Sequence, residues 1–226
     1  MFAQPIHRLS VAKEDYIRSI SKLSKDLEPV TISALASSMG VTSPSVSGMI
    51  QRLEQEGLVE HLPRTGVLLT PEGQKLALNI HRRHRLVETF LVEVLSLDWA
   101  EVHEEAEALE HHLSERLVKA IDRYLGYPKT DPHGHPIPSS DGSVIKRDLR
   151  PLDTLLESET ATLREVNSDD PERIRRWKDQ GFVPGARIRV IRCQPEEEVW
   201  LFDVDNREVM TGTKGIAGLF VEKTGS

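Results

Sequence analysis

Four side chains between residues 103 and 111 have the types and spacing of a metal site. They are His103, Glu107, Glu110 and His111. At roughly 100° per residue, a helix would hold all four within an arc of about 100°. Carboxylate oxygen and imidazole nitrogen are the donors that divalent first-row transition metals accept, and without an ion the converging acidic groups would repel one another. The alternative is a solvated acidic helix face, since the neighbours include Glu101, Glu104 and Glu105.

A second pair of donors, His84 and Glu88, lies upstream at a spacing of four residues. Its segment has helical periodicity, with an apolar stripe of Leu86, Phe90, Leu91, Val94 and Leu95. Pairs of this kind are common on protein surfaces. However, two helices joined by the short stretch Ser96 to Asp98 would form an antiparallel hairpin and bring both sets of donors face to face.

The composition is that of an ordinary globular chain, with 226 residues, 38% hydrophobic and 29% charged. The apolar runs fall far short of the about 18 residues of a membrane span, and the N-terminus lacks the order of a signal peptide. Cys193 is the single cysteine, which excludes an internal disulfide and a cysteine-based zinc or iron–sulfur site within one chain. We therefore expect a protein of the reducing cytoplasm with no membrane partner.

The net charge of −7 argues weakly against nucleic acid as a partner, but the charge is unevenly spread. Residues 1–75 contain eight Lys or Arg and eight Asp or Glu, so this region is neutral and the surplus acid lies downstream. Local charge matters more than the total for docking on phosphate. Nucleic-acid binding by the N-terminal region is therefore compatible with the composition.

The N-terminal region predicts three helices. The first runs from Val11 to about Leu27 and ends before Pro29. The second is capped by Thr31, runs through Met39 and stops at Gly40, and the third opens at Thr42 or Ser43 and runs to about Gln55. The last two, joined by a tight glycine turn, form a helix-turn-helix. A hairpin of residues 58–61 and 67–70 follows as a wing, and a long helix starts at residues 70–73.

The composition changes between Gly126 and Pro151, where proline, glycine, serine and aspartate predict turns and a linker. Beyond it, residues 160–166, 187–192, 199–204 and 219–222 have strand character, and residues 171–180 suggest a short helix closed by Gly181. Several short strands in this length suggest a small barrel. We expect a mainly α protein with a small β domain: a winged helix-turn-helix over 1–75, a helical domain over 76–145, a linker over 146–158 and a barrel over 159–226.

The start of the third helix carries candidate DNA contacts. It is a run of short side chains, Thr42, Ser43, Pro44, Ser45 and Ser47. Short hydroxyls suit phosphate and thymine-methyl contacts, although helix capping explains one or two of them. Arg52 on the helix and Arg64 in the wing turn are candidate phosphate contacts, while an isolated surface arginine is more often only solvated.

Taken together, these motifs resemble the diphtheria toxin repressor family of metal-dependent transcriptional regulators. The resemblance rests on the winged helix-turn-helix, on residues 83–88 (RHRLVE), on residues 102–114 (VHEEAEALEHHLS) and on residues 134–138 (GHPIP). It covers the whole chain, since the larger members also end in an SH3-like domain. It implies a helical dimerisation and metal-binding domain, a homodimer, and no enzymatic activity.

The resemblance also implies two metal sites. The primary site falls on Asp15 with Glu107, Glu110 and His111. The ancillary site falls on His84, Glu88 and His103, completed from the SH3-like domain by Asp170, with Glu172 in reserve.

The ligands favour manganese. In the iron-sensing branch the positions of Asp15 and Glu107 hold sulfur-containing residues, whereas two carboxylates suit Mn²⁺, with Fe²⁺ as the other candidate. The manganese branch has another acidic ligand one turn after Asp15, where this chain has Arg18. That departure speaks against a closely spaced two-metal cluster.

The implied mechanism follows from where the ligands lie. Asp15 belongs to the DNA-binding domain and the other primary ligands to the dimerisation helices, so one ion would tie the two together. The recognition helices of a dimer would then be held about 34 Å apart, as a palindromic operator demands. Two other readings remain open: a helical-bundle enzyme with a carboxylate-bridged metal pair, and a winged-helix regulator that senses an organic ligand.

Overall fold

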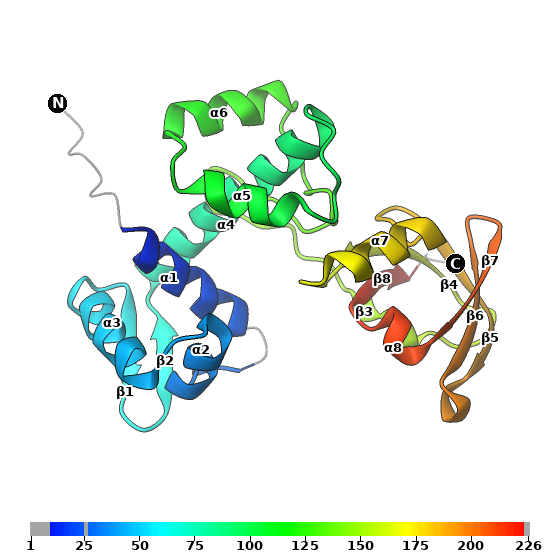
Figure 1. The fold of residues 1–226 in the computed structure, drawn as a ribbon, viewed down its shortest axis with the longest axis horizontal. Helices are drawn as coiled ribbons and strands as arrows, with labels where there is room; N and C mark the ends of the chain where they lie inside the picture. The colour runs from blue at the N-terminus through cyan, green and yellow to red at the C-terminus, as the bar shows by residue number, and fades with distance from the viewer. Residues whose placement is uncertain (1–9, 25–26, 224–226) are drawn as a thin grey trace. The chain divides into compact units, whose positions relative to one another are not determined.

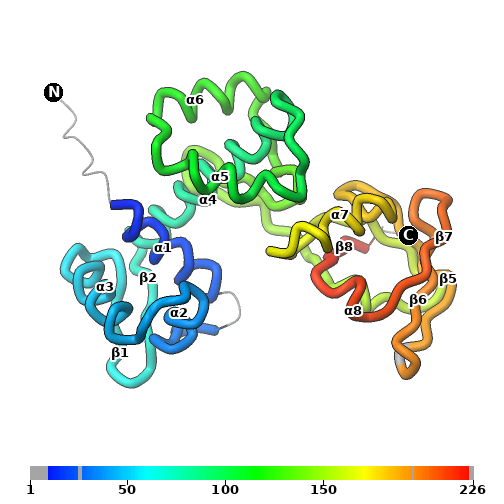
Figure 2. Tube along the Cα trace, viewed as in Figure 1, coloured from blue at the N-terminus to red at the C-terminus, as the bar shows by residue number. Residues whose placement is uncertain are grey.

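The computed structural model describes residues 10–24 and 27–223 and divides into two compact units. Unit 1 comprises residues 1–83 with 138–142, and unit 2 comprises residues 84–137 with 143–226. Figure 1 labels the elements, and Figure 2 traces the chain through them. Within the described ranges, no helix is both long enough and apolar enough to cross a membrane.

Unit 1 begins with three helices, α1 (Val11–Leu23), α2 (Ile32–Met39) and α3 (Ser43–Gln55). The hydroxyl of Thr31 caps α2 by accepting a hydrogen bond from the Ala34 amide, and Gly40 ends it at φ 64°. Helix α1 ends four residues before the expected Leu27. Leu27 itself is 42% exposed, so burial would give a longer helix no gain. The rest of that expected helix, residues 25–26, lies outside the described residues.

The predicted wing is the antiparallel pair of β1 (Val59–Leu62) and β2 (Gly66–Leu69). Val67 also pairs with Val30, which ties the wing to the segment before α2. Gly66 has φ 152°, and a Cβ there would lie 2.5 Å from the Val30 oxygen, so this position requires glycine. The core of the unit is one cluster from α1, α2, α3, the wing and α4 (Pro71–Glu93), including Ile17, Ile20, Leu35, Ile50, Leu53, Val67 and Ile80.

The helical part of unit 2 contains the second half of α4, α5 (Val102–Glu110) and α6 (Glu115–Tyr124). Val87 and Leu91 of α4 pack against Val102 and Ala106 of α5. His84 bonds Glu110 at the end of α5, and Glu88, one turn later in α4, bonds His103 near its start, as the predicted antiparallel hairpin requires. The connection is longer than expected, because Trp99 and Ala100 are buried in the core of the C-terminal domain rather than starting α5.

The C-terminal domain is a six-stranded antiparallel sheet in the order β3-β8-β4-β5-β6-β7. Its elements are β3 (Arg150–Pro151), a 3-10 turn (Leu152–Thr154), β4 (Thr160–Val166), α7 (Pro171–Gln180), β5 (Arg187–Gln194), a 3-10 turn (Pro195–Glu197), β6 (Val199–Val204), β7 (Arg207–Gly212), α8 (Thr213–Ile216) and β8 (Leu219–Lys223). The four expected strands and α7 are present. Strand β7 was not expected. Val209 is its one buried side chain and Met210 is 69% exposed, so no apolar alternation marks this strand in the sequence.

The segment between the helical and β domains contributes residues to both units. Residues 138–142 belong to unit 1, where the Arg82 guanidinium donates to the Pro138 oxygen at 2.6 Å. The stretch expected to be a linker contains β3, and Leu152 and Leu155 are buried in the C-terminal core. The proline-rich composition therefore marks turns that pack against their neighbours.

Candidate metal centre

The donors of α4 and α5 form one hydrogen-bonded group in unit 2. His84 Nε2 lies 3.0 Å from Glu88 Oε1 and 3.0 Å from His103 Nδ1, and His103 Nδ1 lies 3.0 Å from the same Glu88 oxygen. His84 and Glu88 are buried, whereas the His103 side chain is 48% exposed. The potential ligand atoms of the three residues all lie within 4.8 Å of one another. The ancillary set expected from the sequence is thus brought together.

The remaining donors of α5 extend this group. His103 Nε2 lies 3.3 Å from Glu107 Oε1, and Glu110 is 1% exposed with its Oε2 2.9 Å from His84 Nδ1. His111 Nε2 lies 3.4 Å from the other Glu110 oxygen. Helix α5 ends at Glu110 and His111 is its C-cap residue, so three of the four expected donors are in the helix. Six potential ligands therefore form one network.

The carboxylates and histidines of this network stabilise one another's charged forms. Burial opposes the charge on Glu88, but hydrogen bonds from His103 and His84 outweigh it and hold the pKa of Glu88 well below its usual value. Hydrogen bonds to Glu107 and then Glu88 raise the pKa of His103 to about 9 against the effect of burial. Burial disfavours protonation of His84, yet bonds to Glu110 and Glu88 leave its pKa raised. The carboxylates thus attract a cation, which in the metal-free protein is a proton.

Two of the expected ligands, Asp15 and Asp170, come from elements other than α4 and α5. Asp15 is half-buried on α1 in unit 1, whose buried carboxylate Glu14 lies 3.4 Å from Arg83. Asp170 is exposed and caps α7, its Oδ1 accepting a hydrogen bond from the Glu172 amide at 3.0 Å. Asp170 is outside the donor group of His84, Glu88 and His103 among the described residues. Its place in the structure is a helix cap.

A second donor group, which the sequence analysis did not assign, consists of Asp131, His133 and His135. Asp131 Oδ1 accepts hydrogen bonds from the amides of His133 and His135 at 2.9 Å each, and its Oδ2 lies 3.1 Å from His135 Nδ1. Burial opposes a charge on His135, but Asp131 outweighs it and raises the pKa of His135. The sequence signal for this group is the alternation of Asp131, His133 and His135 in the proline-rich segment, of which only His135 belongs to the family motif at 134–138.

Both rings of this second group are held by carbonyl oxygens. His133 Nε2 donates to the Trp99 oxygen at 2.8 Å, and His135 Nε2 donates to Oδ1 of Asn167. With Nε2 donating, a neutral ring carries its lone pair on Nδ1, which in His135 lies 3.1 Å from Asp131 Oδ2. Metal-binding histidines usually donate their other ring N–H to such oxygens. In this part of the C-terminal domain, the residue that contacts the second donor group is Asn167 and not Asp170.

The candidate DNA-contacting residues lie at the exposed start of α3 and at the tip of the wing. Thr42 caps α3, its hydroxyl contacts that of Ser45 at 3.0 Å, and the Ser47 hydroxyl donates to the Ser43 oxygen at 3.0 Å. These bonds confirm that capping explains some of the hydroxyls. Thr42, Ser43, Pro44, Ser45, Arg52 and Arg64 are exposed.

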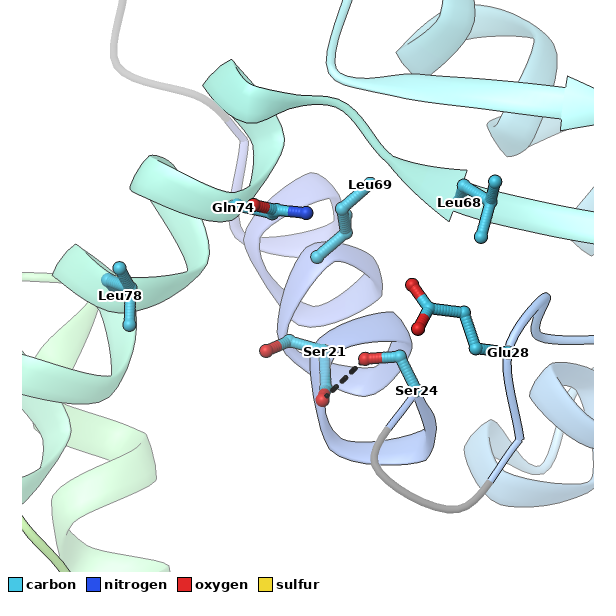
Figure 3. A pocket seen from close by; sticks show the side chains of 7 residues that line it. All are labelled: Ser21, Ser24, Glu28, Leu68, Leu69, Gln74 and Leu78. Carbon is cyan, nitrogen blue, oxygen red and sulfur yellow. Dashed lines mark hydrogen bonds between the residues drawn. The ribbon is translucent and has the colours of Figure 1, made fainter. Parts of the chain in front are cut away.

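Figure 3 shows a pocket of about 250 Å³ in unit 1, between α1, β2 and the start of α4. Its lining combines leucines with a few polar groups: Ser21, Ser24, Glu28, Leu68, Leu69, Gln74 and Leu78. None of the expected metal or DNA ligands is in this lining. The metal donors and this pocket are therefore separate features.

Three family models match the chain in sequence order. The model described as "Iron dependent repressor, N-terminal DNA binding domain" matches residues 8–67. The model described as "Iron dependent repressor, metal binding and dimerisation domain" matches residues 70–139, and the FeoA domain model matches residues 150–222. These features define a metal-dependent transcriptional repressor that carries a DNA-binding domain, a metal-binding and dimerisation domain, and an SH3-like domain.

Individual relatives agree with the family models. The "Iron-dependent repressor IdeR" of Mycobacterium tuberculosis (strain ATCC 25618 / H37Rv) is 32% identical over 189 residues, which cover 78% of this chain and 82% of that protein. The "Transcriptional regulator MntR" of Escherichia coli O157:H7 is 39% identical over 108 residues, covering 48% and 69%. A solved structure described as "Manganese-dependent transcriptional repressor complex with manganese" has a TM-score of 0.85 and 34% identity, and the match covers 94% of this chain and 100% of that chain.

The chain therefore belongs to the diphtheria toxin repressor family of iron- and manganese-dependent repressors. The family consists of transcriptional repressors, which confirms the regulator over the dimetal enzyme. Iron-dependent and manganese-dependent proteins both occur among the relatives, so the comparisons do not discriminate between the two metals.

Proposed function

We propose that the protein is a cytoplasmic dimer that binds palindromic operators of metal-uptake genes when Mn²⁺, or alternatively Fe²⁺, is bound. The observation that carries this is the network of carboxylates and imidazoles around His84 and Glu110, with two buried carboxylates facing three histidines. Such donors suit a hard divalent cation, and no sulfur atom is among them.

We assign the ligands as follows. The primary ion is held by Asp15, Glu107, Glu110 and His111, and the ancillary ion by His84, Glu88 and His103 with Asp170. Asp131, His133 and His135 offer a further group of donors for a divalent ion. The bound ion supplies positive charge, which replaces the protons that neutralise the carboxylates in the metal-free protein.

The chain's own residues would then convert metal binding into DNA binding. Asp15 belongs to the unit that contains α3, and the other primary ligands belong to the unit that contains α5. An ion held by both sets favours those conformations in which the two units are fixed together. The short side chains from Thr42 to Ser47 contact the major groove, and Arg52 and Arg64 contact phosphates.

The decisive experiment is metal-dependent operator binding. The purified protein should bind a palindromic operator in Mn²⁺ and lose that binding in a chelator, with Fe²⁺ titrated in parallel under anaerobic conditions. Glu110→Ala and His111→Ala should abolish the metal dependence while the dimer persists. Equal affinity in chelator and in Mn²⁺ would show instead a metal-independent regulator, such as one that senses an organic ligand.

A further inference from the structure

The pocket of unit 1 in Figure 3 has an aliphatic wall. Leu68 and Leu69 come from β2 and Leu78 comes from α4, and all three residues are half-buried. The volume of the pocket is about 250 Å³. Drug-sized ligands occupy pockets of about 300–1,000 Å³, so this pocket has the size for a smaller molecule with an apolar body.

The polar part of the pocket presents hydrogen-bond acceptors. An ionised carboxylate only accepts, and among the residues that the structure describes the Glu28 carboxylate takes part in no ion pair or hydrogen bond. The Ser24 hydroxyl donates to the Ser21 oxygen at 3.1 Å, so its lone pairs remain open to a donor. Figure 3 shows the Glu28 carboxylate turned towards Ser24 and Leu69. A ligand therefore meets a carboxylate and a hydroxyl acceptor next to an apolar wall.

The charge of the lining favours a cation. The lining residues that the structure describes carry a single charge, that of Glu28. An anion would be repelled, and a neutral molecule would leave the carboxylate unpaired. An alkyl ammonium group keeps its proton up to about pH 10, as the lysine side chain does, and it supplies three N–H donors. An ammonium group on a short aliphatic chain thus matches both parts of the lining.

We propose that this pocket binds a small alkylamine. Glu28 and Ser24 accept hydrogen bonds from its ammonium group, and the three leucines contact its aliphatic chain. The whole lining lies in unit 1, which also contains the wing and α3. The lining includes none of the proposed metal ligands, so the binding of an amine is independent of the metal-site assignment above. The unit that contains the DNA-binding domain thereby has an effector site of its own.

A bound amine contacts β2, the end of α1 and the start of α4 at once. It therefore favours the conformations in which the wing keeps its place against these two helices. The tip of the wing carries Arg64, a proposed phosphate contact, so the amine acts on a part of unit 1 that is proposed to face DNA. Because the amine binds the folded protein, the unfolding temperature rises with the amine concentration.

The test is TROSY NMR of the full metal-free protein, titrated with three probes of equal chain length: hexylamine, hexanol and hexanoate. Hexylamine should shift the amide signals of the lining residues until they saturate, with a dissociation constant on the order of 1 mM for so small a ligand. Hexanol should bind about 3-fold more weakly, because the pair with an exposed carboxylate is lost. Hexanoate should bind more weakly than hexanol, since its charge is repelled by Glu28.

Two variants with the same chemical change separate the role of Glu28 from a general loss of charge. Glu28→Gln keeps the shape of the side chain and removes its charge. It should abolish the preference for hexylamine over hexanol and leave the affinity for hexanol unchanged. Glu60→Gln, at an exposed position of β1 outside the lining, is the matched control and should keep the preference. Thermal unfolding should show that both variants are folded.

Hexylamine shifts that do not saturate, or that spread over the surface instead of the lining, would overturn the proposal. An unchanged preference for hexylamine in Glu28→Gln would overturn it as well. Failure of the proposed metal response has a different signature. In that case operator binding would be equal in chelator and in Mn²⁺, while hexylamine would still bind to the pocket.

Discussion

His103 makes metal binding sensitive to pH, because two carboxylates hold a proton on its ring. Hydrogen bonds to Glu107 and Glu88 raise its pKa to about 9. Since this pKa lies above the usual 6.5, protonation of His103 stabilises the metal-free fold fully below about pH 6.5, and the contribution is lost as the pH rises through about 9. A metal ion must displace the same proton. The affinity for Mn²⁺ should therefore rise with pH up to about 9.

We expect NMR of the metal-free protein to show His103 titrating near pH 9. Glu107→Gln should lower that pKa, because the bond to Glu107 is its largest cause. Glu104→Gln, at an exposed neighbour on the same helix, is the matched control and should leave it in place. A His103 titration close to 6.5 in the wild type would contradict the expectation.

Metal preference is a second property of individual residues. Asp15 and Glu107 offer hard oxygen donors, so Mn²⁺ should activate operator binding at concentrations no higher than Fe²⁺ does. The double variant Asp15→Met and Glu107→Cys should shift the ranking towards Fe²⁺, as measured by operator binding against free metal concentration. The single change Asp15→Asn, which keeps an oxygen donor, is the control. An unchanged ranking in the double variant would refute the role of ligand softness.

Helix α3 contains a glycine that its own fold does not need. Gly48 is exposed, and a Cβ built there would meet nothing within 4 Å. Glycine inside a helix is about 1 kcal/mol less favourable than alanine. We expect Gly48→Ala to raise the thermal stability and to weaken operator binding, since it adds a methyl group to the face proposed to enter the groove.

Gly66→Ala is the contrasting variant. Its φ of 152° and the 2.5 Å approach to the Val30 oxygen should make it destabilising by about 1–3 kcal/mol. Unchanged operator affinity in Gly48→Ala, with the expected gain in stability, would mean that this face of α3 does not closely approach DNA.

The cap of α7 tests whether Asp170 also binds metal. Asp170→Ala removes the cap and should cost about 1 kcal/mol of stability in the metal-free protein. Asp170→Ser keeps a capping oxygen and removes only the carboxylate, so the fold should be as stable as wild type. If Asp170 completes the ancillary site, the serine variant should bind the ancillary ion more weakly in calorimetry. Full affinity in this variant would exclude Asp170 from the site.

The elements were predictable wherever burial and capping were encoded locally. Thr31 and Gly40 bound α2 as expected, and β4, with its alternating buried side chains, begins and ends at the expected residues. The contacts that hold the second donor group were not predictable. Asp131 and His133 meet because an Asp side chain caps the amides of its own turn and a backbone oxygen from the α4–α5 connection holds a ring. No periodicity records such contacts.

Across the molecule, the helical and β parts of unit 2 share a core, which affects how the C-terminal domain can be studied. Trp99 and Ala100 are buried among β-domain side chains, Arg175 of α7 pairs with Glu101, and Lys178 lies 3.7 Å from Asp98. A chain truncated near Arg150 would expose Trp99, which is 6% exposed in the full chain.

We therefore expect truncation near Arg150 to lower the thermal stability of the helical part, and to weaken the ion at His84, Glu88 and His103 more than Asp170→Ser does in the full chain. Arg175→Ala with Lys178→Ala in the full chain is a milder comparison that removes only the ion pairs, and it should have a small effect. Truncation that leaves both unfolding temperature and metal affinity unchanged would contradict a shared core.

The short excursion of residues 138–142 into unit 1 has a topological consequence. The chain passes from one unit to the other at 83–84, at 137–138 and again at 142–143, so three covalent connections join the two bodies. For the primary site proposed above, three tethers leave Asp15 less conformational freedom to lose when an ion binds than a single tether would. A protease cut within 138–142 would leave the bodies linked through α4 and should therefore weaken the primary ion.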